Sequence, residues 1–587
     1  MGVFAALVLA TFGAFFLASQ LKSRPALLDD IRLMRFFSPN GDGERDEQDI
    51  SFTLDETGPA DIDVVDADGA RVRRVAEGVA IVPSRRVRVR WDGRDDDGAR
   101  APDGQYRMRV ILRSEGRAVL AALTVSEGAR IVARGAAVDF ELADAGKAEP
   151  PRFRVLRTDV EPPQEVRTFT GEAGERTAYT WDGRTTTGET APPGIYLIAV
   201  ETRDAARNLG AGPALPLDGT PIEGRPGVTV RTLAVQPPVR PARAGALMSF
   251  RVDARERPYR WSLRRLGSGK ILDKGRKSAG RTTLVLRAPR GRSGVYLLEV
   301  ASAGADTSVP VAVQARAKAV PLVVLPMVTW LGRDPVDTTG DGVPDTLDRG
   351  APVRFPRLFA YPGGLPTGLA RDVAPLLVWL DRQEIRYDIT TDLALTFTDE
   401  PLAADRRGVL FAGSPEWVSR PVARRLRSYV VDGGRVATFA PLALRASVAV
   451  GDSVLSRPSP ATPVDAFGGR IADVRSLAPT APPLSVLGED ASLGLLEGFS
   501  GQLGGAGAVE ELLSPGRGAE VVTSVGEEGT ELRPALSAIR QGDGLVLRVG
   551  LPGWVRRLAA GDQAVEQLTR NLVDILRGAR PRARSAK

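Results

Sequence analysis

The stretch WDGRDDDGARAPDGQYRMRV at residues 91–110 returns in similar form as WDGRTTTGETAPPGIYLIAV at residues 181–200. Each copy begins with Trp-Asp-Gly-Arg, turns through a glycine-containing loop and enters an alternating apolar and polar strand at Gly-x-Tyr. Trp181 follows Trp91 by 90 positions, which is close to the roughly 100 residues of one immunoglobulin-like sandwich. A repeat of this period predicts a small β-domain duplicated in tandem.

The front half of the chain is therefore expected to consist of β-sandwiches, the first over residues 26–125 and the second over residues 126–215. FSPNGDG at residues 37–43, followed by the WDGR…DGQY pattern, resembles the Ig-like domain of the flagellar hook-capping protein. Domains of this type occur in many secreted bacterial proteins, so the resemblance implies a fold and leaves function open. A third β-domain is predicted over residues 225–315, where GVYLLEV repeats the Gly-x-Tyr strand.

Two features of the first two β-domains have alternative interpretations. Trp91 and Trp181 are expected to be buried anchors of their sheets, with sugar-binding platforms as the alternative. The carboxylates of the first domain are expected to form turns, since Asp bonds its own backbone, with calcium ligation as the alternative. These carboxylates are Asp42, Asp46, Asp92, Asp95, Asp96 and Asp97.

The first residues, GVFAALVLATFGAFFLASQL at 2–21, carry no charge. Twenty residues at 1.5 Å rise span about 30 Å, the thickness of the hydrocarbon core of a bilayer. This run predicts a transmembrane anchor, hence a single-pass membrane protein with the membrane as one partner; a buried helix is the alternative. Lys22 and Arg24 follow the run and favour a cytoplasmic body by the positive-inside rule, whereas the secreted type of the β-domains favours an extracytoplasmic one, which we expect.

The composition removes several classes of chemistry. The chain has no cysteine and no histidine, which excludes thiolate nucleophiles, Ser-His-Asp triads and imidazole-ligated metals. The formal net charge is +7, but 72 acidic residues are interspersed with 79 basic ones. A nucleic-acid partner would require clustered Lys and Arg or a known module, and the sequence has neither.

After Ala319 the pattern changes to alternating buried strands and amphipathic helices at short spacing. Such alternation predicts an open, mostly parallel, doubly wound α/β sheet of the flavodoxin-like class over residues 320–587. The expected strands are 320–326, 385–389, 408–413, 435–440 and 545–549, and the expected helices are 373–383, 420–431 and 563–577.

Four segments of this half carry a second resemblance: VVLPMVTW at 323–330, WLDRQEIRYDITTD at 379–392, the stretch from LFAGSPEW to ATFA at 410–440, and LPGW…LTRNLVDIL at 551–576. Together they resemble the C-terminal domain of the N,N-dimethylformamidase large subunit. The resemblance implies a class I glutamine-amidotransferase-like fold. It also implies amide hydrolysis by a mononuclear iron held by tyrosines and a glutamate.

The family's metal-binding loop has a His-Asp-Glu-Tyr-Trp-like sequence, and the corresponding residues here are Ser414, Pro415, Glu416 and Trp417. Glu416 matches the family glutamate, but Ser414 replaces the histidine. Leu331 and its neighbours stand where the family offers a tyrosine. These departures argue against iron. Glu416 and Ser414 remain the catalytic candidates, although Ser414 has no imidazole to activate it and is equally a cap or turn residue.

In open sheets the ligand site lies beyond the carboxyl ends of the strands. Three residues at such ends, Trp330, Asp392 and Trp417, are the ligand-binding candidates. Tyr361, Tyr387 and Tyr429 are further groups whose distance from Glu416 depends on the fold.

An Asp/Gly loop at residues 337–348 has oxygen-bearing side chains at positions 1, 3, 5, 9 and 12 and glycine at position 6, as in a calcium loop. Those side chains are Asp337, Thr339, Asp341, Asp345 and Asp348. A solvated Asp/Gly turn explains the same pattern, and both interpretations stay open.

Three functions follow from these observations. The preferred one is an envelope-anchored protein whose non-catalytic amidotransferase-like domain binds an envelope ligand or protein, carried on Ig-like spacers. The alternatives are an amidohydrolase acting through Glu416 and a metal, and a protein of surface-appendage assembly.

Overall fold

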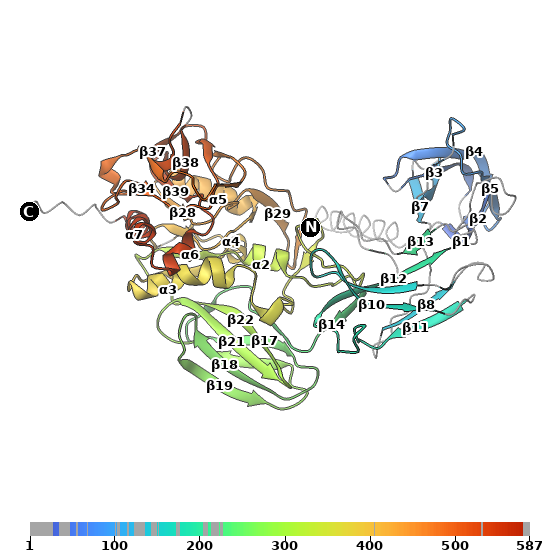
Figure 1. Ribbon diagram of the computed structural model, residues 1–587, viewed down its shortest axis with the longest axis horizontal. Helices are drawn as coiled ribbons and strands as arrows, with labels where there is room; N and C mark the ends of the chain where they lie inside the picture. Colours follow the sequence, from blue (N-terminus) through green and yellow to red (C-terminus); the bar gives the residue numbers. More distant parts are fainter. Residues whose placement is uncertain are drawn as a thin grey trace, which may run out of the picture.

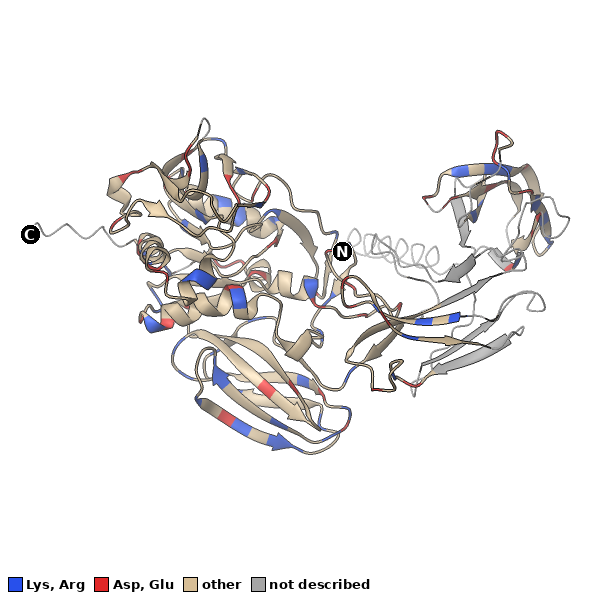
Figure 2. Cartoon of the chain, in the orientation of Figure 1, with Lys and Arg blue, Asp and Glu red and all other residues tan. Residues whose placement is uncertain are grey.

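The structure of the protein is a computed structural model. It describes residues 28–33, 47–54, 57–66, 68–99, 101, 106–113, 117–122, 136–141, 150, 152–171, 176–203, 209–212, 222, 227–403, 405–529 and 532–578. The chain forms β-rich parts in its first half and a large mixed sheet flanked by helices in its second half (Figure 1). Basic and acidic residues are interspersed over all of these parts (Figure 2).

The first β-domain packs two antiparallel sheets against each other, with strand orders β1-β2-β5 and β4-β3-β6-β7. Alternating burial along β2 places Ile50, Phe52 and Leu54 in the core, where they meet Ile62 of the opposite sheet. The strands are β1 (Leu28–Leu33), β2 (Gln48–Leu54), β3 (Gly58–Val65), β4 (Arg71–Ile81), β5 (Val87–Trp91), β6 (Arg107–Leu112) and β7 (Arg117–Ala122).

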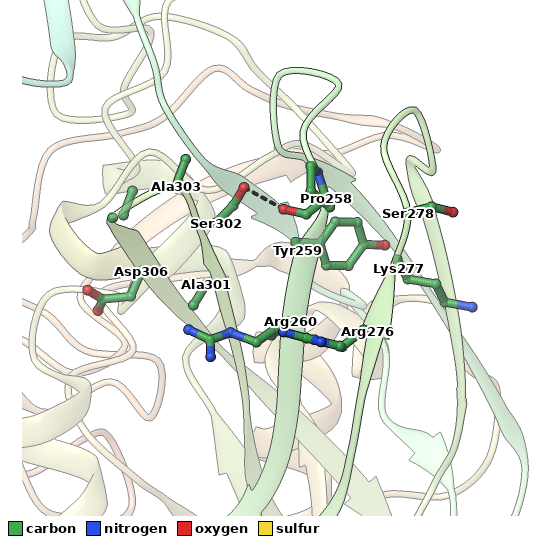
Figure 3. Close-up of a pocket in the computed structure, with 12 residues that line it drawn as sticks. Pro258, Tyr259, Arg260, Arg276, Lys277, Ser278, Ala301, Ser302, Ala303 and Asp306 are labelled. Carbon is green, nitrogen blue, oxygen red and sulfur yellow. Dashed lines mark hydrogen bonds between the residues drawn. The ribbon is translucent and has the colours of Figure 1, made fainter.

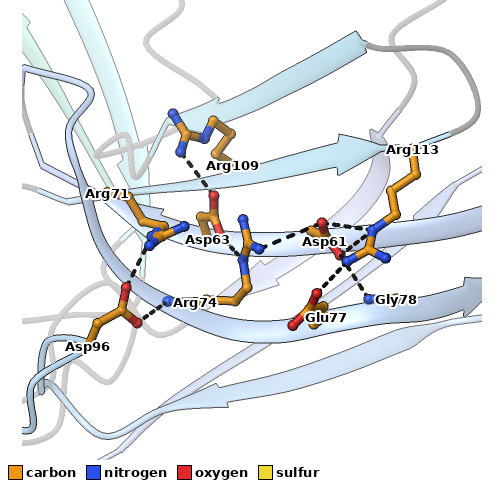
Figure 4. A network of polar contacts seen from close by, with 9 residues as sticks. All are labelled: Asp61, Asp63, Arg71, Arg74, Glu77, Gly78, Asp96, Arg109 and Arg113. Atoms are coloured by element: carbon orange, nitrogen blue, oxygen red, sulfur yellow. Dashed lines mark hydrogen bonds and ion pairs between the residues drawn. The ribbon is translucent and has the colours of Figure 1, made fainter.

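A network of ion pairs stabilises the first β-domain on strand β3 (Figure 4). Asp63, which is fully buried, accepts hydrogen bonds from Arg74 and Arg109, both at 2.9 Å. Asp61 accepts hydrogen bonds from Arg113 at 2.9 Å and from the Gly78 backbone at 2.8 Å. Because each buried carboxylate has a guanidinium partner, burying charge on this strand does not leave it uncompensated.

The two Trp-Asp-Gly-Arg copies adopt the same local structure. Trp91 and Trp181 are 3% and 2% exposed, and each indole N–H donates to the carbonyl of the arginine three residues later, at 2.8 and 2.7 Å. Each ring packs on the tyrosine of its Gly-x-Tyr strand, Tyr106 or Tyr196, with centroids 5.1 and 4.9 Å apart. Both tryptophans are buried anchors, and the sugar-platform alternative is wrong.

Two of the first domain's carboxylates, Asp92 and Asp95, form turns, whereas Asp96 accepts hydrogen bonds from the Arg74 backbone N–H at 2.9 Å and the Arg71 side chain at 3.0 Å, both on β4. Asp92 accepts the Arg94 backbone N–H at 3.1 Å, and Asp95 accepts those of Asp97 and Ala99 at 3.0 and 2.8 Å. Asp42 and Asp46 lie outside the described residues. The described part of the chain contains no group of three such residues placed to hold a metal ion.

The second β-domain has a sheet of order β10-β9-β12-β13, with β14 also paired to β12, and a separate β8–β11 pair. Its core is formed by Phe153, Val155, Trp181, Tyr196 and Ile198. The strands are β8 (Ala136–Glu141), β9 (Arg152–Arg157), β10 (Gln164–Thr170), β11 (Arg176–Trp181), β12 (Gly194–Arg203), β13 (Leu209–Gly212) and β14 (Gly227–Val230).

The third β-domain again has two sheets, of orders β15-β17-β20 and β16-β22-β21-β18-β19. Its strands are β15 (Ala234–Gln236), β16 (Ala242–Arg243), β17 (Leu247–Asp253), β18 (Tyr259–Arg265), β19 (Ile271–Lys277), β20 (Thr283–Arg287), β21 (Gly294–Ser302) and β22 (Ala305–Gln314). The buried residues of this domain and of the following sheet form one continuous hydrophobic cluster.

The second half is built on a nine-stranded sheet of order β25-β23-β26-β28-β39-β38-β37-β33-β34. The first five strands are parallel, and the last four continue the sheet in antiparallel fashion. The strands are β23 (Leu322–Leu325), β25 (Asp388–Thr391), β26 (Val409–Phe411), β28 (Arg435–Thr438), β33 (Leu484–Gly488), β34 (Gln502–Leu503), β37 (Ala519–Glu527), β38 (Arg533–Gln541) and β39 (Gly544–Val549).

Helices and short strands complete this half. The helices are α2 (Met327–Arg333), α3 (Ala374–Arg382), α4 (Asp392–Thr396), α5 (Arg420–Val431), α6 (Trp554–Ala559) and α7 (Gln563–Arg577), with short turns η1 (Pro362–Gly364), η2 (Leu369–Val373) and η3 (Ala491–Leu493). The short strands are β24 (Val353–Arg354), β27 (Trp417–Ser419), β29 (Ala446–Val450), β30 (Val454–Ser456), β31 (Arg470–Ile471), β32 (Arg475–Ser476), β35 (Ala508–Val509) and β36 (Leu512–Ser514).

The predicted doubly wound, flavodoxin-like α/β domain is wrong, because the chain is mostly β and the sheet is not an open parallel one. A parallel connection needs a crossover of a dozen or more residues, usually a helix, whereas antiparallel strands are joined by short turns. The segment between β28 and β39 supplies strands joined antiparallel, β37 to β38 and β38 to β39, in place of further crossover helices.

The membrane prediction is also corrected. Its predicted helix at residues 2–21 lies outside the described residues. Within the part that is described, no helix has both the length and the apolar character that crossing a bilayer requires. This finding contradicts the predicted single-pass membrane protein.

Candidate functional site

A cavity of about 320 Å³ lies at the carboxyl ends of four parallel strands. Pro326 follows β23, Ser414 follows β26, Phe439 follows β28 and Trp554 follows β39, and all four line it. This is the edge of a parallel sheet where loops diverge and ligands bind in other open sheets. The cavity is therefore the candidate functional site.

The walls of the cavity combine aromatic and aliphatic side chains with polar and charged ones. Trp330 of α2 and Trp554 of α6 are 3% and 1% exposed, and the Trp554 indole N–H donates to Thr569 at 3.0 Å. Tyr361, from the segment before η1, donates its hydroxyl hydrogen to the Trp330 carbonyl at 2.6 Å. These hydrogen bonds satisfy the buried polar ends of the rings and leave their apolar surfaces to the cavity.

Arg333 at the end of α2 joins the cavity to Glu416. Its guanidinium donates to a Glu416 carboxylate oxygen at 2.5 Å and to Asp348 at 3.0 Å, and it lies 5.3 Å from the centre of the Trp417 ring. Arg333 lines the cavity, whereas Glu416, Asp348 and Trp417 do not.

Glu416 is 8% exposed, and its backbone N–H donates to the Thr329 hydroxyl at 3.0 Å. Burial raises the pKa of Glu416, and the neighbouring Arg333 opposes that shift. The carboxylate is thus held in place by a buried ion pair, which costs desolvation free energy but fixes one geometry.

Two further arginines line the opposite part of the cavity. Arg371 is bound to its neighbour Asp372, with hydrogen bonds at 2.9 Å. Arg556 of α6 is exposed and has no carboxylate within ion-pair distance among the residues that the structure describes. Among the residues that the structure describes, Arg556 is therefore a cation of this cavity without a carboxylate partner.

Ser414 lies on the cavity wall but is poorly arranged for nucleophilic attack. Its hydroxyl donates to the Pro441 carbonyl at 2.8 Å. A serine nucleophile needs a base that accepts its proton, and a peptide carbonyl cannot take that role. The structure therefore places Ser414 at the site as a hydrogen-bond donor.

Asp392, predicted to bind ligand, is instead buried beneath the sheet edge and does not line the cavity. One carboxylate oxygen accepts the backbone N–H groups of Val328 and Leu393 at 3.0 and 2.7 Å, which ties β25 to the first turn of α2. The other oxygen has no hydrogen-bond partner among the described residues. Burial raises the pKa of Asp392 to about 7.

The Asp/Gly loop at residues 337–348 bonds mainly to itself. Asp337 accepts backbone N–H groups from Gly340 at 2.5 Å and Gly342 at 2.8 Å, and Asp345 accepts that of Thr338 at 2.6 Å. Donors within the loop thus occupy oxygens that a calcium ion would need, and no described group of three carboxylates is placed to hold one. The structure supports the turn interpretation and gives calcium no support.

The remaining loop candidates connect to other parts. Asp341 accepts the Ile222 backbone N–H at 3.0 Å, and Thr339 donates its hydroxyl hydrogen to Asp337 at 3.2 Å. Asp348 pairs with Arg333, as described above. The predicted metal group is therefore divided among an intraloop network, an interdomain contact and the Arg333 ion pair.

Two domain families match this chain. Residues 281–443 match the N,N-dimethylformamidase beta subunit-like, C-terminal family. Residues 40–116 match the FlgD Ig-like domain family. Both resemblances predicted from the sequence are confirmed. Neither match covers half of the chain, so each describes a domain and not the whole protein. The dimethylformamidase-like region begins within the third β-domain and ends beyond β28, and it includes the strand ends after β23, β26 and β28 that line the cavity.

Solved structures show only weak likeness to the chain. A β-galactosidase from Bacillus circulans sp. alkalophilus is 17% identical over 35% of this chain and 27% of its own, with a TM-score of 0.25. A β-galactosidase from Rahnella sp. R3 is 16% identical over 44% of this chain and 32% of its own, with a TM-score of 0.25. The exo-β-1,4-mannosidase from Opitutaceae bacterium strain TAV5 is 18% identical over 36% of this chain and 31% of its own, with a TM-score of 0.22. The chain spans less than a third of each, and likeness at this level says nothing of its activity. No curated protein matches the sequence.

The residues of the dimethylformamidase-like region do not fit the iron that the resemblance implied. Arg333 already holds Glu416 and places a positive charge beside it. The Tyr361 hydroxyl is already used, since it donates to the Trp330 carbonyl at 2.6 Å. Tyr387 contacts Arg265 of the third β-domain, and Tyr429 packs on Gly434, so neither extends a ligand set around Glu416.

Several cavity residues were not identified from the sequence: Arg333, Arg371, Phe439, Trp554 and Arg556. Arg333 lies in the segment where the dimethylformamidase family has a tyrosine and this chain does not. The missing tyrosine could have drawn attention to Arg333 as a site residue. Arg556 lies in α6, the first helix after β39, so the strand-end rule applied to the last strand would have pointed to its neighbourhood. Arg371 comes from a long segment without regular alternation, and no sequence signal identified it.

Proposed function

We propose that this chain is a non-catalytic binding protein whose cavity at the sheet edge takes a small organic anion. The observation that carries the proposal is the uncompensated guanidinium of Arg556 in a cavity with aromatic walls. Binding sites of small molecules are concave, mostly apolar and supplied with a few polar groups that fix orientation. A guanidinium presents planar, bidentate hydrogen bonds that match a carboxylate. A carboxylate with an apolar body therefore fits this cavity.

The arrangement of the polar groups argues for binding without reaction. The chain has no cysteine or histidine, Ser414 donates to a carbonyl, and Glu416 is held by Arg333. A general base must be able to reach the proton that it removes, and Glu416 does not line the cavity. In this proposal the first two β-domains act as spacers. The bound carboxylate is that of a small molecule or of a side chain of another protein.

Titration calorimetry on the full chain tests the proposal with two probes: benzoate, a carboxylate with an aromatic body, and acetate, the carboxylate alone. We expect benzoate to bind more tightly than acetate, and Arg556→Ala to weaken benzoate binding at least tenfold. Arg424→Ala removes an exposed arginine of α5 that lies outside the cavity and serves as the matched control. Equal losses in both variants, or no binding of either probe, would overturn the proposal.

The family match favours one second candidate, an amidohydrolase that acts through Glu416 and a metal. Elemental analysis of the purified chain and release of formate from N,N-dimethylformamide test it together. Stoichiometric iron or zinc, with hydrolysis abolished by Glu416→Ala, would favour this candidate over the binding protein. We expect neither metal nor hydrolysis, because the residues around Glu416 do not form a ligand set.

A further inference from the structure

The loop that follows β28 forms one wall of the sheet-edge cavity and is held by hydrogen bonds from other segments. Pro441 and Leu442 of this loop line the cavity. The Pro441 carbonyl accepts the Ser414 hydroxyl at 2.8 Å, and the Leu444 backbone N–H donates to the Pro415 carbonyl at 2.7 Å. The segment after β26 therefore fixes the loop on both sides of Leu442.

Leu442 has a backbone conformation that leucine rarely adopts. Its φ is +60°, and among the described non-glycine residues that line the cavity it is the one with a positive φ. A residue with a Cβ is strained in this left-handed region, and such strain persists only where surrounding contacts impose it. The half-buried Leu442 side chain lies at the cavity wall. The strain thus coincides with a side chain that a ligand in the cavity can contact.

A buried carboxylate holds Leu442 in this conformation. Glu510 is 1% exposed, and its carboxylate accepts the Leu442 backbone N–H at 2.9 Å. The two residues lie 68 positions apart in the chain, so folding alone brings them together. A hydrogen bond from a backbone N–H to a carboxylate is charge-assisted and stronger than one to a neutral acceptor. Glu510 therefore fixes the loop at its strained residue.

Glu510 is itself held by two buried arginines. The oxygen that binds Leu442 also accepts from Arg445 at 2.9 Å, and the other oxygen accepts from Arg548 of β39. Arg445 and Arg548 are 4% and 5% exposed. The Glu510 backbone N–H also donates to the Gly550 carbonyl, just after β39, at 2.7 Å. Glu510 thus connects the loop after β28 to the end of β39, and residues that follow β39 form another wall of the cavity.

The cavity of about 710 Å³ at one end of the third β-domain is arranged differently (Figure 3). Arg260 of β18 lies opposite Arg276 of β19, and the adjacent Tyr259 lies opposite Lys277. Because successive side chains of a strand point to opposite faces of the sheet, these two pairs do not meet at one ligand. At the sheet edge, by contrast, the contacts of Glu510 and Ser414 meet at a single loop of the cavity wall.

We propose that Leu442 contacts the apolar body of the bound carboxylate and that Glu510 is the positioning residue that presents Leu442 to it, an inference that rests on the function proposed above. Burying a carboxylate with two guanidinium groups costs desolvation free energy even when they are paired, and a left-handed leucine adds strain. Both costs fall on residues that fix one wall of the cavity. A wall of fixed shape lowers the entropy that is lost when a ligand binds. Leu442 therefore selects for the body of the ligand, whereas Arg556 binds its charged end.

Calorimetric titration of the full chain with benzoate and with acetate tests Leu442. Leu442→Ala and Leu442→Gly should each weaken benzoate binding about tenfold, because each removes the apolar contact, and should leave acetate binding unchanged. Glycine adopts the left-handed conformation without strain, so Leu442→Gly should unfold at a higher temperature than Leu442→Ala. The control is Ala319→Gly, at an exposed residue with φ +55° outside the cavity, which should not change benzoate binding.

A double-mutant cycle separates positioning by Glu510 from a purely structural role. Glu510→Gln should weaken benzoate binding about three- to tenfold in the wild type and have no further effect in Leu442→Gly, where no side chain is left to position. A purely structural role would weaken binding equally in both backgrounds. The control is Glu511→Gln, because Glu511 is 3% exposed and pairs with Arg475 at 3.0 Å. If Glu510→Gln does not fold, the Leu442 variants still decide the proposal.

The outcomes distinguish this inference from the function on which it rests. Benzoate binding that depends on Arg556 but not on Leu442 would overturn the inference and leave the proposed function intact. Equal weakening by Glu510→Gln and Glu511→Gln would overturn the positioning role, and a lower unfolding temperature for Leu442→Gly than for Leu442→Ala would contradict the strained conformation. A wild type that does not bind benzoate would overturn the proposed function and this inference together.

Discussion

At the scale of single residues, the candidate site is organised by side chains that hold other side chains. Arg333 binds Glu416 and Asp348 and lies over the Trp417 ring, so a guanidinium that lines the cavity also holds a sequence-predicted carboxylate. Asp392 acts in a similar way on the backbone, since it fixes the first turn of α2 against β25. Arg333 itself lines the cavity, together with Trp330, Ser414 and Arg556, whereas Glu416 and Asp392 do not.

Asp392→Asn tests the positioning role through pH. Burial raises the pKa of Asp392 to about 7 from its ordinary 3.8, so between these values the folded state binds a proton that the unfolded state does not. The wild type therefore loses stability as pH rises through this window, by up to about 4 kcal/mol from this residue alone. Asparagine keeps the oxygen that accepts both N–H groups and does not ionise.

Urea unfolding of wild type and Asp392→Asn from pH 4 to pH 8 measures the effect. As pH rises to about 7, the unfolding free energy of the wild type should fall relative to that of the variant. Above about pH 7 the difference between the two should stay constant. If the difference in unfolding free energy does not change with pH, the assigned protonation of Asp392 is contradicted. If the wild type gains stability relative to the variant as pH rises, the pKa of Asp392 is lowered by folding and not raised.

At the scale of elements, the loop at residues 337–348 connects the second β-domain to the second half of the chain through hydrogen bonds. The Gly227 backbone N–H donates to the Gly340 carbonyl at 2.9 Å, and the Thr158 hydroxyl donates to the Gly342 carbonyl at 2.5 Å. Both donors lie at the second β-domain, on or beside β14 and β9. The aspartates that resembled a calcium loop shape the turn, and the turn carries the contact between domains.

Gly342→Ala should disrupt the contact between this loop and the second β-domain. Gly342 has φ +83°, and a Cβ there would lie 2.9 Å from a Leu197 methyl carbon and 3.0 Å from the Gly227 Cα. We expect a loss of about 1 kcal/mol from the left-handed backbone and about 1–3 kcal/mol more from overpacking. Gly363→Ala is the control, since Gly363 has φ +63° and open space around it.

Hydrogen exchange of the β12–β14 pair and chemical unfolding measure these effects. Amides of β12 and β14 should exchange faster in Gly342→Ala and at the wild-type rate in Gly363→Ala. Equal stability losses in the two variants, with no change in exchange at β14, would show that the contact between the loop and the second domain contributes nothing.

At the scale of the whole molecule, the third β-domain packs as one unit with the nine-stranded sheet and is not a separate folding domain. One hydrophobic cluster runs through both, and Arg265 of β18 donates two hydrogen bonds of 2.9 Å to Asp381 of α3. Ser293 also donates to the buried Asp388 at 2.6 Å. The first β-domain, in contrast, has its own core.

We therefore expect the third β-domain and the nine-stranded sheet to unfold together. In native-state hydrogen exchange with increasing urea, amides of β21 and β26 should lose protection in one transition, and amides of β3 in another. Asp381→Ala should separate β21 from β26, whereas Glu299→Ala, which removes a partner of Arg264 within the third domain, should not. Separate transitions for β21 and β26 in the wild type would contradict a shared core.

Much of the local structure could be predicted because it depends on neighbours in sequence. The helices predicted at 420–431 and 563–577 coincide with α5 and α7, and the Trp-Asp-Gly-Arg repeat predicts two equivalent turns that the structure shows. The strand-end rule also pointed to Trp330 and Ser414, which line the cavity. These features follow from apolar periodicity, caps and turn chemistry, which act over a few residues.

Other features required tertiary contacts. Strand periodicity does not state whether a neighbour is parallel or antiparallel, so the continuation from β39 to β38 and the mixed sheet were missed. The spacing of the Asp/Gly loop fits a calcium loop and a turn equally well, and the donors within the loop and its contact with the second β-domain, which favour the turn, are visible only in the structure. The ion pair between Arg333 and Glu416 joins α2 to the loop after β26, between residues 83 positions apart in the chain, and no local pattern predicts such a pair.

The sequence by itself determined the repeated β-domains, the positions of the buried strands and helices, the two family resemblances and the lack of thiol and imidazole chemistry. Only the tertiary structure decided the strand directions of the large sheet, the shared core of the third β-domain and the cavity with its uncompensated arginine. The reason is physical: propensity, periodicity and turn chemistry act between residues close in the chain, whereas charge compensation, burial and strand pairing depend on residues that folding alone brings together.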